Sequence, residues 1–145
     1  MTVLNDEIYE AAWVSLARGH QGVLGRIETA LQSADLPPLG WYDVLLELSR
    51  SRETGVRAFE LECRLLLPQY GLSRLLDRIE KAGYIERRVC KDDRRGKLLF
   101  ITQSGEDIRQ RMWPVYQKAI LDILGKKLSK KEAEQFVLTL SKLRV

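Results

Sequence analysis

Residues 74–97 are predicted to form a helix that leads directly into a short β-hairpin, and this segment carries the net charge of the chain. Leu75, Leu76 and Ile79 recur at helical spacing, and Gly83 can end the helix in a left-handed conformation. Two β-rich stretches around a charged turn follow, which is typical of a hairpin. The segment holds nine Lys/Arg and five Asp/Glu, so its surplus equals the +4 of the whole chain. A localised basic surface attracts a polyanion, and DNA is the first candidate.

A second short apolar helix is expected just before this segment, over 58–66. The turn at 67–71 separates the two helices, and the later helix is expected to begin near Pro68, because proline is tolerated in a first helical turn. Two short helices joined by a tight turn and followed by a hairpin describe a winged helix-turn-helix. In that fold the second helix can enter a major groove while the hairpin tip reaches the neighbouring minor groove.

Longer helices are expected on both sides of this unit. Residues 5–34 have helical periodicity and no proline, but the glycines at 19, 22 and 25 weaken the middle. They indicate either close approach of another helix, a bend, or a break into two helices. After a capping Thr102, two apolar stripes follow one long helix, which Pro114 should kink, and a capping box at Ser129 opens a final helix. The fold class is therefore mainly α with a small hairpin wing. Its expected parts are an N-terminal dimerisation helix (1–36), a winged helix-turn-helix lobe (37–102) and C-terminal dimerisation helices (103–145).

Composition argues against several functional classes. The chain has one histidine, two cysteines without disulfide or metal-site spacing, and no catalytic or phosphate-binding motif. Its apolar runs are too short to cross a membrane, and its first residues lack the pattern of a signal peptide. We expect a cytoplasmic protein that is not an enzyme, has no metal site and needs no cofactor.

Two blocks resemble the MarR family of bacterial transcription regulators. Segment 93–105 is similar to the family's wing signature: an Asp-x-Arg at the wing (Asp93 and Arg95), a returning strand, an apolar residue, Thr, two variable residues and Gly. Segment 72–87 looks like the family's recognition helix and its exit. The resemblance covers residues 30–124 clearly. It implies a homodimer that binds double-stranded DNA at a pseudo-palindromic operator and represses transcription until a small ligand, often aromatic or phenolic, loosens the binding.

The resemblance also implies which side chains would contact DNA. Arg95 would insert into a minor groove with Asp93 holding its guanidinium, although a merely solvated hairpin tip is the alternative. Arg78 is open to two interpretations, a phosphate contact or a partner within its own helix. The predicted DNA-binding residues are Gln69, Tyr70, Ser73, Arg74 and Arg78 on the recognition helix, and Asp93, Arg94, Arg95 and Lys97 on the wing.

A possible effector cleft between the lobes would be formed by aromatic residues and the single histidine. Its candidates are Trp13, His20, Trp41, Tyr42 and Trp113, and the alternative for each aromatic residue is ordinary core packing. Cys63 is expected to pack inertly on an apolar helix face. Cys90 has several basic neighbours in sequence, which lower a thiol pKa, so it is either a redox-active thiol or inert. A winged-helix protein-interaction module that does not read DNA is the alternative to a DNA-binding regulator.

Overall fold

The computed structural model describes residues 3–89 and 96–144. The expected mainly helical fold with one hairpin is confirmed. In chain order its elements are α1 (Val3–Ser33), α2 (Leu39–Arg50), α3 (Ala58–Arg64), α4 (Leu72–Lys81), β1 (Ile85–Val89), β2 (Lys97–Ile101), α5 (Gln103–Ile120), the π-helical turn η1 (Leu121–Gly125) and α6 (Lys130–Ser141).

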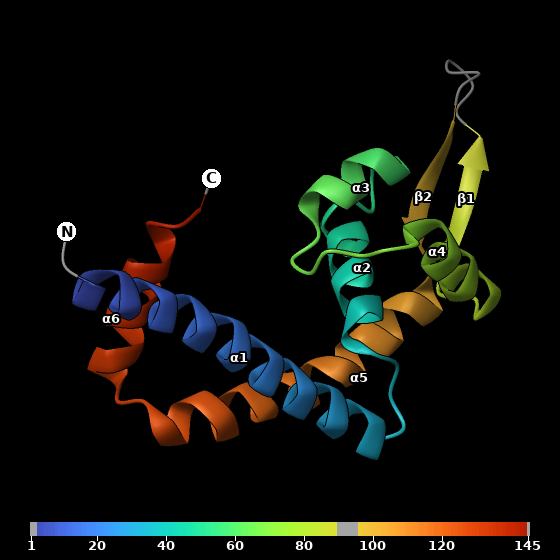
Figure 1. The fold of residues 1–145 in the computed structure, drawn as a ribbon. Coiled ribbons are helices and arrows are strands. Elements are labelled where there is room, and N and C mark those ends of the chain that lie inside the picture. The colour runs from blue at the N-terminus through green and yellow to red at the C-terminus, as the bar shows by residue number, and fades with distance from the viewer. Residues whose placement is uncertain (1–2, 90–95, 145) are drawn as a thin grey trace.

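The elements are arranged in two groups (Figure 1). Helices α2, α3 and α4 and the hairpin gather on one side, while α6 and the N-terminal half of α1 lie on the other. Helices α1 and α5 pack against each other, and α5 also packs against α2. The two long helices therefore connect the helix-turn-helix unit to the terminal helices.

Helix α1 is continuous, so the interpretation of two shorter helices was wrong. A Cβ placed on Gly19, Gly22 or Gly25 would meet no atom of the described residues within 4 Å, so no described part of the protomer approaches these glycines closely. Within residues 6–33, only the C-terminal part of α1 is buried, through Ile27 and Leu31. This packing fixes one end of the helix, while the other end projects away from the core.

One hydrophobic core joins the three segments predicted from the sequence. Val44, Leu45 and Leu48 of α2 are almost fully buried in it, together with residues of α1, α4 and α5. The lobes therefore share a core, and the exact boundaries predicted at 36 and 102 stay a prediction. Cys63 was expected in this packing, but its side chain is exposed, because the seven-residue α3 buries only Leu61.

The hairpin is attached to the rest of the chain through the outer edge of β2 and through contacts of β1 with α4. Strands β1 and β2 pair antiparallel, with Ile85 opposite Ile101 and Val89 opposite Lys97. On its other side β2 forms an isolated bridge, in which the backbone of Leu99 exchanges hydrogen bonds of 2.8 and 3.0 Å with Val56. The hairpin is therefore attached to the loop between α2 and α3 as well as to α4.

Thr102 and Gly105 join the hairpin to α5. Thr102 caps this helix, as the sequence predicted. The Thr102 hydroxyl accepts from the Gly105 backbone N–H at 3.1 Å and donates to the Gly83 carbonyl at 2.6 Å. Gly83 has φ of 85°, and the amides of Gly83 and Tyr84 bond back to Glu80 and Ile79 in a Schellman motif. The end of α4, the end of β2 and the start of α5 are thus fastened together at one point.

Three local expectations concern the start of α4, the course of α5 and the start of α6. Helix α4 begins at Leu72 and not near Pro68, because Gly71 adopts a left-handed conformation with φ of 73° that interrupts any helix starting earlier. Helix α5 continues through Pro114 to Ile120, and the π-helical turn η1 follows it. The kink expected at Pro114 stays a prediction. The capping box at Ser129 is confirmed at the start of α6.

Candidate nucleic-acid interface

Helix α4 buries one face and exposes the other. Leu72, Leu76 and Ile79 point into the core, and the exposed face carries three predicted DNA-contacting residues, Ser73, Arg74 and Arg78. Apolar residues at this spacing anchor a helix by one stripe and leave the opposite stripe to solvent. A polar, cationic surface is therefore presented along the whole of α4.

The other two residues predicted for the recognition helix precede it. Gln69 and Tyr70 lie in the turn before Gly71, so their assignment to the helix was wrong. The Tyr70 side chain is fully exposed, whereas Gln69 is half-buried and its amide would contact a Cβ placed on Gly40. Tyr70 is therefore free to contact a partner near the start of α4.

The basic residues of this segment fall into two sets. Among the described residues, Arg74 and Arg78 have no ion-pair partner, so the interpretation of Arg78 as an intrahelical partner was wrong. Arg87 of β1 instead bonds to Glu80 and Asp77 of α4, at 3.0 Å for Asp77. Arg88 pairs with Glu86 and lies 4.2 Å from the Phe100 ring centroid. The cations of α4 are available to an external anion, while those of β1 stabilise the protein itself.

The double ion pair of Arg87 has two consequences for α4. It fixes the helix against the hairpin at two points, because the Arg87 side chain is only 22% exposed and its two partners are about one turn apart on α4. It also offsets one of the two negative charges that Asp77 and Glu80 place on α4, and those charges would otherwise repel a phosphate backbone more strongly. The exposed side of the helix is therefore more cationic than its sequence alone indicates.

The hairpin contributes one described candidate, Lys97, which is exposed at the start of β2. Asp93, Arg94, Arg95 and Cys90 lie outside the described residues, and their assigned roles stay predictions.

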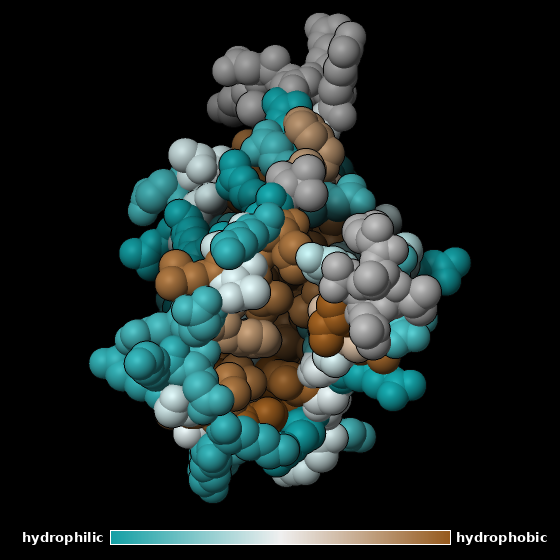
Figure 2. Space-filling model, turned by 60° about the vertical axis from the view of Figure 1, so that its left-hand side comes forward, coloured by the Kyte–Doolittle hydropathy of each residue, from teal (hydrophilic) through white to brown (hydrophobic). Residues whose placement is uncertain are grey.

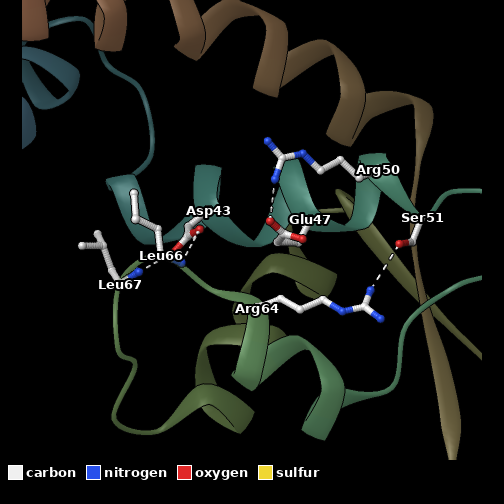
Figure 3. Close-up of polar contacts among 7 residues, drawn as sticks. All are labelled: Asp43, Glu47, Arg50, Ser51, Arg64, Leu66 and Leu67. Atoms are coloured by element: carbon white, nitrogen blue, oxygen red, sulfur yellow. Dashed lines mark hydrogen bonds and ion pairs between the residues drawn. The ribbon is translucent and has the colours of Figure 1, made fainter. Parts of the chain in front are cut away.

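A buried carboxylate that the sequence analysis missed holds the turn before α4 (Figure 3). Asp43 of α2 is only 6% exposed, and its two oxygens accept from the backbone amides of Leu66 at 3.0 Å and Leu67 at 2.8 Å. The signal was present in the sequence as an acidic residue in an otherwise apolar helix, and a buried charge needs hydrogen-bond partners.

The residues predicted for an effector cleft lie in three places. Tyr42 stacks on Trp113, and Tyr116 packs edge-on against both, with ring centroids 5.3 to 6.2 Å apart. Burial raises the pKa of Tyr116, and the nearby Tyr42 and Asp43 raise this pKa further. Trp41 instead meets Tyr84 edge-on at 6.0 Å. Trp13 and His20 lie on exposed faces of α1.

A hollow of about 310 Å³ lies beside Trp41. It is formed between α1, the start of α2, the turn before α4 and α4 itself, and Arg78 contributes a cation to its wall. The remaining lining residues are Leu24, Glu28, Pro38, Leu39, Gly40, Leu67, Pro68, Gln69 and Leu75. Of the five predicted cleft residues, only Trp41 lines this hollow.

Two features are absent from the part of the chain that the structure describes. Among residues 3–89 and 96–144, no three His, Cys, Asp or Glu side chains are grouped as a metal ion would require. No helix in the same part of the chain is long and apolar enough to span a bilayer.

Comparison with known proteins gives a consistent picture. The model of the MarR family matches residues 34–96. The HTH-type transcriptional regulator PapX of Escherichia coli is 32% identical over 102 residues, which cover 70% of this chain but only 62% of PapX. The MarR family regulator Sco3205 of Streptomyces coelicolor, solved in complex with DNA, superposes with a TM-score of 0.82 at 21% identity, over 99% of this chain and 87% of that one. The organohalide-sensing regulator RdhR-CbdbA1625, in its 2,4-dichlorophenol-bound form, superposes with a TM-score of 0.81 at 18% identity, over 94% of this chain and 79% of that one. The chain belongs to the MarR family of transcription regulators.

Proposed function

We propose that this protein is a cytoplasmic, homodimeric repressor that binds double-stranded DNA at a pseudo-palindromic operator and releases it when a small ligand binds. The observation that carries the DNA-binding part is the exposed face of α4, where Arg74 and Arg78 have no ion-pair partner among the described residues. The structure of Sco3205 in complex with DNA supports it.

The surface of the isolated chain supports the homodimer. The chain exposes 10,892 Å², whereas a compact monomer of its mass would expose about 7,600 Å². The excess of roughly 3,300 Å² is far more than the ~800 Å² that each partner contributes to a standard interface. Apolar side chains also form a concave region at the centre of the molecular face that Figure 2 shows. The exposed apolar residues of the terminal helices include Ile8, Tyr9, Trp13, Phe136, Val137, Leu138 and Leu143. A second copy that covers them through its own terminal helices would form a C₂ dimer.

A first prediction separates the two DNA-contacting elements. Arg74→Ala should weaken binding to a selected operator by about 1–3 kcal/mol and relax preference at one base pair, if Arg74 contacts a base edge. Arg95→Ala should instead lower the affinity for all sequences and reduce the salt slope by about one unit, because a phosphate or minor-groove cation is lost. Fluorescence anisotropy over a salt series, on sites selected from random DNA, measures both quantities.

Lys130→Ala is the matched control, because it removes an exposed cation from α6, far from α4 in the chain. It should leave the operator affinity unchanged. Equal losses for all three variants would show that only overall charge matters. Salt-insensitive pairing with another protein, without DNA binding, would favour the interaction-module alternative.

The ligand part of the proposal rests on the hollow beside Trp41. Trp41 and Arg78 both line the hollow, and an aromatic residue together with a cationic one suits an aromatic anion. The phenol bound by RdhR-CbdbA1625 supports this class of ligand. A ligand there would contact both α1 and the turn before α4, so it could shift the position of α4 if it binds one arrangement more tightly.

We therefore expect salicylate or a chlorophenol to raise the melting temperature and to weaken operator binding. Trp41→Leu should remove both effects, whereas Trp13→Leu should remove neither. A compound that stabilises the protein but leaves the affinity for DNA unchanged would contradict an effector role.

A further inference from the structure

We propose that Asp43 is a positioning residue for the recognition helix: from α2 it holds the backbone of the turn that leads into α4. The proposal rests on the proposed DNA-binding function, and it adds a residue that lies outside the exposed surface of α4. Its basis is the pair of hydrogen bonds that the Asp43 carboxylate accepts from two consecutive amides, those of Leu66 and Leu67 (Figure 3).

The turn has few other polar attachments. Helix α3 ends at Arg64, and α4 begins eight residues later, at Leu72. Among the residues that the structure describes, no backbone–backbone hydrogen bond involves residues 66–70, and Pro68 has no N–H to donate. At the end of the turn, Gly71 is the residue type with the widest backbone freedom. The path of the chain into α4 therefore depends strongly on the point where Asp43 holds it.

A carboxylate suits this position better than any neutral side chain. Ionised aspartate has two oxygens that only accept, which matches two amide donors side by side. Hydrogen bonds to a charged acceptor are shorter and stronger than neutral ones, and burial limits competition from water. An asparagine keeps one acceptor but turns an N–H₂ donor toward the other amide, so one of the two bonds is lost.

The helix that carries Asp43 is itself firmly placed. Val44, Leu45 and Leu48 anchor α2 in the core, and the adjacent Tyr42 packs on Trp113 and Tyr116 of α5. Asp43 thus links a rigid element, in contact with the long helix α5, to a turn with little structure of its own. Sequence readout needs base-contacting side chains at fixed positions, whereas non-specific phosphate binding tolerates small shifts.

The experiment compares Asp43→Asn and Asp43→Ala with Glu47→Gln as the matched control. Glu47 lies one turn later on α2 and pairs with Arg50 at 2.9 Å, so its change removes a carboxylate from the same helix without touching the turn (Figure 3). Two quantities are measured: hydrogen exchange of the Leu66 and Leu67 amides by NMR, and the ratio of specific to non-specific DNA affinity. Loss of folded protein lowers both affinities equally, so only misplacement of α4 changes their ratio.

We expect protected Leu66 and Leu67 amides in the unaltered protein. In Asp43→Asn at least one should exchange about ten- to a hundredfold faster, and the affinity ratio should fall by about tenfold or more, with a larger fall in Asp43→Ala. Glu47→Gln should change neither. An unchanged ratio in Asp43→Asn, or unprotected amides in the unaltered protein, would overturn the proposal. If the unaltered protein binds no DNA, the proposed function is wrong, while the amide exchange still reports whether Asp43 holds the turn.

Discussion

Val137→Glu on α6 will convert the protein from a dimer to a monomer at micromolar concentration. No residue of α6 is buried within its own protomer, and Val137 is 61% exposed although it is apolar. If a second copy covers this helix, an ionised carboxylate at position 137 must be desolvated without a partner. That cost weakens association at least a hundredfold, or by about 3 kcal/mol.

Gln135→Glu provides the control, because it adds the same charge to the same helix at a position that is already polar and exposed. Sedimentation equilibrium of the two variants and the unaltered protein gives the three dissociation constants. An intact Val137→Glu dimer would place the interface elsewhere, and dissociation of both variants would indicate a general effect of charge.

Gly105→Ala will lower the free energy of unfolding by about 3 kcal/mol or more. A Cβ at this position would lie 2.1 Å from the carbonyl oxygen of Tyr84 and 2.7 Å from Cγ1 of Ile101. The first contact is with backbone, so rotation of a side chain cannot relieve it. The first turn of α5 would have to move away from the hairpin, which breaks the junction formed by Thr102.

Ser104→Ala tests whether the effect is specific, since Ser104 is exposed in the same helical turn and its replacement creates no such contact. Urea denaturation should show a lower midpoint for Gly105→Ala alone, with an unchanged slope if the folded state keeps its compactness. Equal midpoints for the two variants would mean that α5 can shift at little cost.

Features set by neighbours in sequence were predicted well. Gly83 ends α4, Thr102 caps α5 and Ser129 caps α6, because each signal depends on residues within a few positions. The two β-rich stretches after Gly83 likewise form the predicted hairpin.

Features that depend on residues far apart in the chain were not predicted. Asp43 bonds to amides 23 and 24 residues away, and the two ion pairs of Arg87 require the final angle between α4 and β1. The sequence predicted that α4 begins near Pro68, because proline is favourable in a first helical turn. The left-handed conformation of Gly71, which delays the start to Leu72, cannot be read from that local signal. The continuity of α1 was also not predicted, because its three glycines lower the helix propensity and yet do not interrupt the helix.

The uneven packing of the terminal helices makes the stability of this protein depend on its concentration. Residues 6–18 of α1, the part of its N-terminal half whose burial the structure describes, and all of α6 contribute no buried residue to their own protomer. If a second copy supplies the missing contacts, folding and association form one coupled equilibrium. Each tenfold dilution then lowers the free energy that favours the folded dimer by about 1.4 kcal/mol. The melting temperature should then rise with protein concentration. A cell that makes few copies would hold a less stable regulator, which is more open to proteolysis than the same chain at high abundance.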